Sequence, residues 1–297
     1  MSYQFMEFLL THRIKRKDIC FCFQIKKMNK ETLLESLSLD ESFVECIYVF
    51  GSRAYGTASR KRQSDYDIVI VLKSNAWDQH PNLQWSSLDF MFNHHWINPT
   101  FRHLFSGETD KKCFVDLGDR DAQMWMFNIE TFRQLLKTNT MFAIECIFLP
   151  EDLKWIEKIP FYEEFQVNNS MLEQSVMNHS RSHLFMSAKN LTEVLFPNEN
   201  TDLETENVLK EMSSDSLWNR TPLPRGYNFY KTKKLLWHSI RLIYFGIQVK
   251  SFSRINDFAE ANYLYEDLIA IESHRWIDFH QKYIELYNKL TNRFLHK

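Results

Sequence analysis

The chain has 297 residues, of which 44% are hydrophobic and 15% aromatic, and this is enough to bury a sizeable core in two domains. Only 6 glycines are present, which argues against an all-β protein full of tight turns. The net charge of −2 excludes a strongly basic chain, so any nucleic-acid binding must come from a local basic patch.

The cysteines and the hydropathy pattern bear on the cellular compartment. The five cysteines show neither CxxC spacing nor the density of a disulfide-stabilised scaffold. No apolar run reaches the length of a membrane span, and no apolar segment is followed by a signal-peptide cleavage pattern. We therefore expect a soluble, cytoplasmic protein in a reducing environment, and the sequence leaves its oligomeric state open.

The first 27 residues have a character of their own. Residues 1–27 mix basic pairs with short apolar patches, and we treat them as an uncertain N-terminal extension. Met28 is an alternative start, because residues 29–43 (NKETLLESLSLDESF) predict an amphipathic first helix. An organelle presequence is the competing interpretation, since the extension is basic and poor in acidic residues, although its serine content is low.

Two predicted strands enclose the most informative segment, GSRAYGTASRKRQSDYD. Residues 46–50 (CIYVF) before it and residues 67–72 (DIVIVL) at its end are apolar and β-prone. Glycine has no Cβ, so Gly51 lets the backbone approach a bulky anion closely, and the Ser52 hydroxyl and following N–H groups can donate to phosphate oxygens. This half of the segment predicts a site for the phosphates of a nucleotide.

The other half of the segment carries two carboxylates. Asp65 and Asp67 are two residues apart on a predicted strand, so both side chains project from one face. Two carboxylates that close repel each other, and a divalent cation relieves the repulsion while it binds phosphate oxygens. The pattern predicts an Mg²⁺ site, with Mn²⁺ as the alternative metal; a loop followed by a solvated strand end is the competing interpretation.

Basic residues flank the proposed phosphate site. Arg53 directly follows Ser52, and three more cations lie a few residues further on. Together they predict a local patch for a nucleotide or nucleic acid, and a solvated basic loop explains the last three equally well. The four residues are Arg53, Arg60, Lys61 and Arg62.

Beyond residue 150 the patterns become helical. We expect helices over 204–212, 230–249, 260–273 and 275–295, separated by segments rich in Asn and Pro. Lys234, His238 and Arg241 fall at i, i+4 and i+7, and this spacing predicts a cationic stripe that binds a triphosphate or a nucleic-acid backbone. An ordinary solvated helix face is the alternative. His179 and His183 have helical metal-ligand spacing, but no third ligand is evident.

The Gly-Ser turn followed by Asp-x-Asp on the next strand resembles the polymerase-beta superfamily of nucleotidyltransferases. Within it, GSRAYGT and SDYD look most like the predicted RlaP-type nucleotidyltransferases associated with RNA repair. Residues 121–150 and the segment KLLWHSIRL are also similar to that group, so the resemblance covers about residues 48–246. It implies an α/β (α+β) fold, a mixed sheet of nucleotidyltransferase type with a C-terminal helical domain.

The resemblance also implies a third catalytic carboxylate on a later strand. The best-aligned position holds Gln123, and Asp121, two residues earlier, would share its strand face. We favour Asp121 as the third metal ligand and the group that helps to deprotonate the acceptor. Asp89, in LDFMFN, is the rival. If neither reaches the metals, the chain is a nucleotide-binding module without catalysis.

Together these inferences define a metal-dependent nucleotidyltransferase. Residues 28–150 are expected to form the catalytic domain and residues 151–297 a helical domain that closes one wall of the cleft. An acceptor hydroxyl would attack the α-phosphate of an NTP in line and release pyrophosphate. The resemblance implies an RNA end as acceptor, while relatives of this fold also modify proteins and small molecules.

Overall fold

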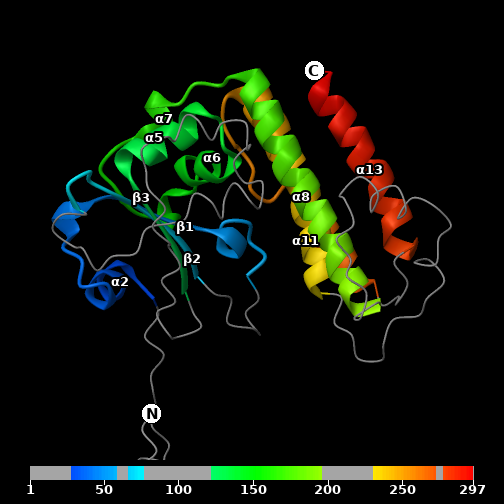
Figure 1. Ribbon diagram of the computed structural model, residues 1–297, viewed down its shortest axis with the longest axis horizontal. Helices are drawn as coiled ribbons and strands as arrows, with labels where there is room; N and C mark the ends of the chain where they lie inside the picture. Colours follow the sequence, from blue (N-terminus) through cyan, green and yellow to red (C-terminus); the bar gives the residue numbers. More distant parts are fainter. Residues whose placement is uncertain (1–27, 59–65, 77–121, 196–229, 272–276, 297) are drawn as a thin grey trace, which may run out of the picture.

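The computed structural model describes residues 28–58, 66–76, 122–195, 230–271 and 277–296, and every structural statement below concerns these residues (Figure 1). Their centre is a four-stranded mixed sheet with strand order β3-β2-β1-β4. β2 pairs with β1 in antiparallel and with β3 in parallel orientation, and β1 pairs with β4 in antiparallel orientation. The strands are β1 (Val44–Phe50), β2 (Tyr66–Leu72), β3 (Ala122–Asn128) and β4 (Lys154–Glu157).

Helices account for most of the remaining described residues. The expected mixed α/β fold with a helical C-terminal part is therefore confirmed. The short helical elements are η1 (Glu41–Phe43), η2 (Gly51–Arg53), η4 (Glu151–Leu153) and α7 (Phe161–Glu164). The longer helices are α2 (Lys30–Ser36), α5 (Ile129–Lys137), α6 (Met141–Ile147), α8 (Asn169–Leu195), α11 (Tyr230–Phe252), α12 (Asn262–Ala270) and α13 (Ile277–Leu295). None of the described helices is long and apolar enough to cross a membrane.

The two strands predicted on either side of the Gly-Ser segment are confirmed as β1 and β2. Their β-branched and aromatic residues suit a pleated surface that is buried on both faces. Five consecutive residues of β2, from Ile68 to Leu72, are completely or almost completely buried. The register of β1 against β2 shifts between Val44 and Cys46, which indicates a β-bulge at the start of β1.

The sheet has a different cover on each face. On one face Tyr48, Val69 and Trp125 belong to a large core that continues into α5 and α6. On the other face Ile70 and Met126 join Leu33, Leu34 and a few neighbours in a smaller core below α2. Figure 1 shows α5 and α6 on the side of the sheet opposite α2.

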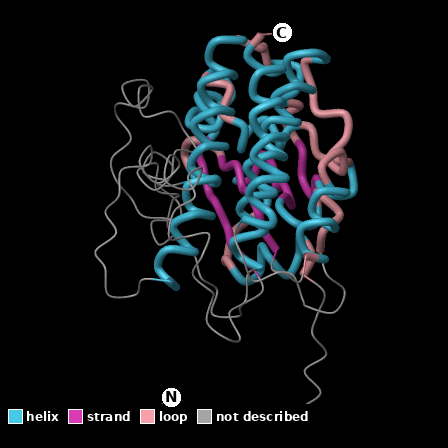
Figure 2. Tube along the Cα trace, turned by 90° about the vertical axis from the view of Figure 1, so that its right-hand side faces the viewer, coloured by secondary structure: helices cyan, strands magenta, loops and turns pink. Residues whose placement is uncertain are grey.

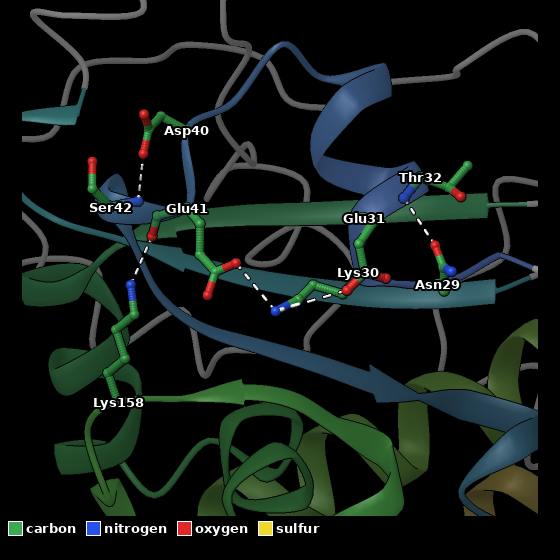
Figure 3. A network of polar contacts seen from close by, with 8 residues as sticks. All are labelled: Asn29, Lys30, Glu31, Thr32, Asp40, Glu41, Ser42 and Lys158. Carbon is green, nitrogen blue, oxygen red and sulfur yellow. Dashed lines mark hydrogen bonds and ion pairs between the residues drawn. The ribbon is translucent and has the colours of Figure 1, made fainter.

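Short polar contacts fix α2 at the side of the sheet (Figure 3). The side chain of Asn29 caps the helix by accepting a hydrogen bond of 2.9 Å from the Thr32 N–H. Lys30 forms an ion pair with Glu41 at 3.1 Å, and the Lys158 ammonium donates to the Glu41 carbonyl at 2.7 Å. Glu41 thus connects α2 with the segment that follows β4.

The C-terminal half is built around two long helices, α8 and α11, which run side by side in Figures 1 and 2, with α13 next to them. Gly246 allows this packing, because a Cβ there would lie 2.9 Å from side-chain atoms of both Val176 on α8 and Phe294 on α13. Buried hydroxyls also join the pair: Ser180 and Ser187 of α8 donate to backbone carbonyls of α11 at 2.7 and 2.8 Å. Predicted helices over 230–249, 260–273 and 275–295 match α11, α12 and α13, whereas residues 204–212 lie outside the described residues.

One face of the sheet shares its hydrophobic core with the C-terminal helices. The larger core cluster contains Cys46 of β1 and also Phe294 of α13. Strand β4 lies after residue 150, where the sequence analysis placed the end of the first domain, and it forms an edge of the sheet. Its pairing with β1 means that the sheet draws on residues from both sides of that proposed boundary. The division at residue 150 stays a prediction.

Candidate nucleotidyltransferase site

The Gly-Ser segment forms a compact turn directly after β1. Gly51 has φ of 71°, the left-handed region that glycine adopts without steric cost, and it begins the helical turn η2. The carbonyl of Gly51 accepts from the Tyr55 N–H at 3.1 Å. The carbonyl of Ser52 accepts from the N–H groups of Thr57 and Ala58 at 2.9 and 3.0 Å. These bonds close residues 51–58 into one unit at the end of the strand.

The carboxylate of Asp67 lies directly against this turn. The sheet register places Asp67 opposite Phe50, the residue before Gly51. A Cβ built on Gly51 would lie 2.0 Å from Oδ2 of Asp67, closer than any real contact. Glycine at position 51 therefore leaves the space that the carboxylate occupies, and the predicted phosphate turn and one predicted metal ligand are neighbours in space.

Arg53, the last residue of η2, contacts the first residue of β2. Its guanidinium carbon is 3.5 Å from the centre of the Tyr66 ring, a cation–π contact that holds the charge next to Ser52. Tyr66 in turn packs at an angle against Trp155 of β4, with ring centres 6.0 Å apart. The basic residues at positions 60–62 lie outside the described residues, so of the predicted basic patch Arg53 is the member that the structure places.

The other predicted metal ligands fall outside the described residues. These are Asp65, Asp121 and the rival Asp89. The parallel register of β2 and β3 pairs Asp67 with Gln123, the position that the sequence comparison aligned with the third carboxylate. Among the described residues no group of three His, Cys, Asp or Glu side chains could hold a metal ion. Asp67 nevertheless fits as one ligand, because its carboxylate is an oxygen donor next to the turn that the sequence predicts to bind phosphate.

Behind the turn, Tyr55 joins a buried ion pair. Its hydroxyl donates to Oε2 of Glu145 at 2.5 Å, and the same oxygen accepts from a terminal N–H of Arg241 at 2.9 Å. The side chains of Glu145 and Arg241 are only 4% and 5% exposed. Burial opposes the charge of Arg241, but Glu145 and Tyr55 raise its pKa above the ordinary value, so the guanidinium stays charged.

The predicted stripe on α11 is arranged differently from a row of three cations facing solvent. Arg241 is buried in the ion pair with Glu145, and His238 packs edge-on against the Tyr55 ring, with centres 6.1 Å apart. Burial lowers the pKa of His238 well below 6.5, and the charge of Arg241 lowers it further, so this ring is neutral at pH 7. Lys234 is partly exposed. Nucleotide contacts by Lys234, His238 and Arg241 stay predictions.

His179 and His183 lie beside each other on α8, as their spacing predicts. Their ring centres are 4.7 Å apart, and the His183 ring is 5.6 Å from that of His238 on α11. Nδ1 of His183 lies 3.1 Å from the carbonyl of His179. These three rings are not among groups that could hold a metal ion in the described part of the chain.

The sequence analysis did not assign Tyr55 or Glu145 to the site, although Tyr55 closes the turn and Glu145 pairs with both Tyr55 and Arg241. A signal for Glu145 exists, because it is the one charged residue in the apolar segment MFAIECIFL, and a carboxylate in such a segment requires a buried partner. Tyr55 carries a weaker signal. It lies inside the turn motif, but its sequence position does not tell whether its ring faces solvent or the core.

Comparison with known proteins adds one finding. Residues 30–160 match the family model described as the nucleotidyltransferase domain, a range that includes all four strands, the Gly-Ser turn and Asp67. Comparisons with curated proteins and with solved structures each gave no match. The match ends shortly after β4, which agrees with the place of that strand in the sheet. Residues 30–160, a little under half of the chain, are therefore similar to a nucleotidyltransferase domain.

Proposed function

We propose that this protein transfers a nucleoside monophosphate from an NTP to an acceptor hydroxyl and releases pyrophosphate. The observation that carries the proposal is the contact between the Asp67 carboxylate and Gly51 inside the nucleotidyltransferase domain. It brings a metal-binding type of side chain to the glycine turn that the sequence predicts to bind phosphate oxygens. We place the activity in the cytoplasm, where the free, buried thiols of Cys46 and Cys146 are expected to stay reduced.

In this proposal each part of the site has one task. Gly51, Ser52 and Arg53 hold and orient the β- and γ-phosphates, with Lys234 as a further cation on α11. Asp65, Asp67 and Asp121 would hold Mg²⁺ or Mn²⁺. A divalent cation bound there would neutralise phosphate charge and favour the alkoxide form of the acceptor. Asp121 would also accept the proton of the acceptor hydroxyl, so that the oxygen attacks the α-phosphate in line with the leaving pyrophosphate.

For the acceptor we propose the hydroxyl at an RNA end. The support is the resemblance of GSRAYGT and SDYD to the RlaP-type enzymes associated with RNA repair. Arg53, whose guanidinium lies over the Tyr66 ring beside the turn, provides a positive charge of the kind that binds a phosphate backbone. Transfer to a protein or to a small molecule is the alternative within the same chemistry.

One observation favours a second function, a nucleotide-binding module without catalysis. In the sheet register the residue opposite Asp67 is Gln123, and a glutamine cannot serve as the third carboxylate. A measurement of pyrophosphate release separates the two functions, since both predict NTP binding but only the enzyme releases pyrophosphate.

The test is to incubate the full chain with each labelled NTP, Mg²⁺, and total RNA or total protein. Label in RNA together with released pyrophosphate supports the proposal, and label in protein changes the acceptor. The double variant Asp65→Asn, Asp67→Asn should lose transfer and keep its fold, because it removes ligands and repulsion together. Asp152→Asn, at an exposed position in η4, is the matched control and should behave as wild type.

Two further variants separate the candidates for the third carboxylate. A group that acts in the transition state lowers the rate far more than it weakens NTP binding when it is removed. Asp121→Asn should show this pattern, and Asp89→Asn should change little. The reverse result would move the site to Asp89. NTP binding without pyrophosphate release in the wild-type protein would establish the binding module instead.

A further inference from the structure

Tyr55 belongs to two parts of the molecule at once. Its backbone closes the Gly51–Ser52 turn, since its N–H donates to the Gly51 carbonyl at 3.1 Å. Its side chain points away from the turn into the helices and is only 4% exposed as a residue. Its carbonyl accepts a hydrogen bond of 2.6 Å from the side-chain amide of Asn262, the first residue of α12. The turn is thus attached to the C-terminal helices through one residue.

The hydroxyl of Tyr55 is held by the carboxylate of Glu145, which is itself buried in an ion pair. Oε2 of Glu145 accepts both from this hydroxyl and from Arg241, and all three groups are buried. An ionised carboxylate away from water must keep its partners, because an unpaired buried charge costs several kcal/mol. Moving the Tyr55 hydroxyl would leave Glu145 with one donor fewer at Oε2. The pair therefore fixes the direction of the phenol ring.

The ring itself is enclosed on its face and at its edges. The guanidinium carbon of Arg241 lies 3.6 Å from the ring centre. Arg241 therefore makes a cation–π contact with the ring and also pairs with Glu145, the carboxylate that accepts from the Tyr55 hydroxyl. Trp237 and Phe245, also on α11, pack against the ring of Tyr55, with ring centres 5.8 and 6.2 Å away from its centre. Three side chains of α11 therefore contact the ring directly.

We propose that Tyr55, held by Glu145 and Arg241, is a positioning residue that sets the Gly51–Ser52 turn against Asp67 for binding of the NTP phosphates. This inference rests on the proposed function and adds to it a role for residues that do not touch the nucleotide. A turn that is fixed before the ligand arrives loses little conformational freedom on binding. In this proposal Arg241 does not contact the nucleotide. It pairs with Glu145, and Glu145 accepts the hydrogen bond that holds Tyr55.

The central test is the variant Tyr55→Phe, which keeps the ring and removes only the hydroxyl. Glu145 retains Arg241, so the fold should persist with a moderate loss of melting temperature. We expect the Kd and KM for NTP to rise about tenfold, the size of one hydrogen bond to a charged group. The kcat at saturating NTP should change much less, because the turn binds phosphates in the ground state and the transition state alike.

Tyr244→Phe is the matched control. Tyr244, on α11, is buried, and its hydroxyl is paired with that of Tyr263 on α12 at 2.9 Å, so the variant removes a hydroxyl that does not bond to Glu145. It should lower the melting temperature without changing KM. If Tyr55→Phe fails to fold, Asn262→Ala tests the same attachment from the backbone side and should raise KM in the same direction.

The possible outcomes separate the two hypotheses. A wild-type enzyme that binds NTP and releases pyrophosphate, with a KM that rises in Tyr55→Phe but not in Tyr244→Phe, supports the positioning role. The same active wild type with an equal KM in both variants overturns that role and leaves the proposed function intact. A wild-type protein that binds no NTP overturns the proposed function, and the positioning role with it.

Discussion

The two faces of the central sheet carry alternate residues of the same strands, yet they support very different structures. Tyr48, Val69 and Val71 on one face belong to a core that continues through the C-terminal helices. Ile47 and Ile70 on the other face belong to a smaller core below α2. Since side chains alternate along a strand, Asp67 shares the face of Val69 and Val71. The site thus depends on the face with the larger core.

The largest effect is expected from Gly51→Ala, at the point where the large-core face meets the site. A Cβ there would overlap with Oδ2 of Asp67 and displace the carboxylate. A displacement of about 1 Å at a catalytic group can cost about a hundredfold in rate, so transfer should fall by at least that order. The measurement is pyrophosphate release under saturating NTP.

Gly56→Ala provides an unusually close control for this variant. Gly56 has nearly the same φ, 72° against 71°, but the nearest atom to an added Cβ is 3.6 Å away. It should cost about 1–2 kcal/mol of stability for the left-handed conformation and leave the rate nearly unchanged. Equal loss of activity in both variants would show that strain in the turn matters and that contact with Asp67 does not.

The second prediction compares the two cores directly. Phe142 of α6 packs edge-on against Phe50, the residue before Gly51, with ring centres 5.1 Å apart, and Leu33 is fully buried below the opposite face. Phe142→Ala and Leu33→Ala should both lower the free energy of unfolding, by about 3–5 and 2–5 kcal/mol. Only Phe142→Ala should also lower the transfer rate. Chemical denaturation and kinetics at a temperature where both variants are folded would test this, and a slow Leu33→Ala enzyme would contradict it.

The third prediction concerns pH. The folded protein holds His238 neutral, because burial and then Arg241, His183, Lys234 and His179 lower its pKa below 6.5. Below about pH 6.5 the unfolded chain therefore binds a proton that the folded chain does not, and stability falls from there towards the lowered pKa. Above this window the stabilisation is fully present. Melting temperatures between pH 5 and 8 should lose part of this slope in His238→Gln and keep it in His296→Gln, an exposed position.

The smallest effect is expected at the outer surface of the large-core side. Arg133 of α5 and Glu164 of α7 form a bidentate ion pair at 2.9 Å, but their side chains are 40% and 44% exposed. The hydrogen bonds from Arg133 lower the pKa of Glu164, and solvent screens most of the gain. Glu164→Gln should cost less than about 1 kcal/mol and leave transfer unchanged. A larger loss in denaturant titration would mean that α7 contributes more to the core than its exposure indicates.

Local pattern predicted the parts of this fold in which one face of an element is apolar or a motif is contiguous. The strands over 46–50 and 67–72, the turn between them and the helix around Trp237 were all readable, because burial imposes a short period on the sequence. Helix α8 had no such pattern. It buries Ser175, Ser180 and Ser187, which look like surface residues until their partners on other elements are known.

The site shows the same limit. The Gly51–Asp67 contact follows from two adjacent strands, so sequence spacing was a good guide to it. The partner of Arg241 is Glu145, 96 residues away, and spacing along α11 cannot reveal such a pair. A charged residue in a helical stripe faces solvent or a ligand only if the fold places no residue of opposite charge against it. Sequence spacing along the helix does not reveal such a residue.

The hydrogen bond from Asn262 to the carbonyl of Tyr55 spans 207 residues of chain. A ribosome therefore completes the glycine-containing turn long before it produces the residue that attaches the turn to the helices, and a domain generally folds as a unit. We expect NTP affinity to rise late in synthesis, only after α11 and α12 have left the exit tunnel. Stalled nascent chains that crosslink an NTP analogue equally well before and after Asn262 emerges would contradict this order. If affinity does rise late, partial translation products carry the motif but bind NTP weakly, so they compete little with the finished protein for nucleotide.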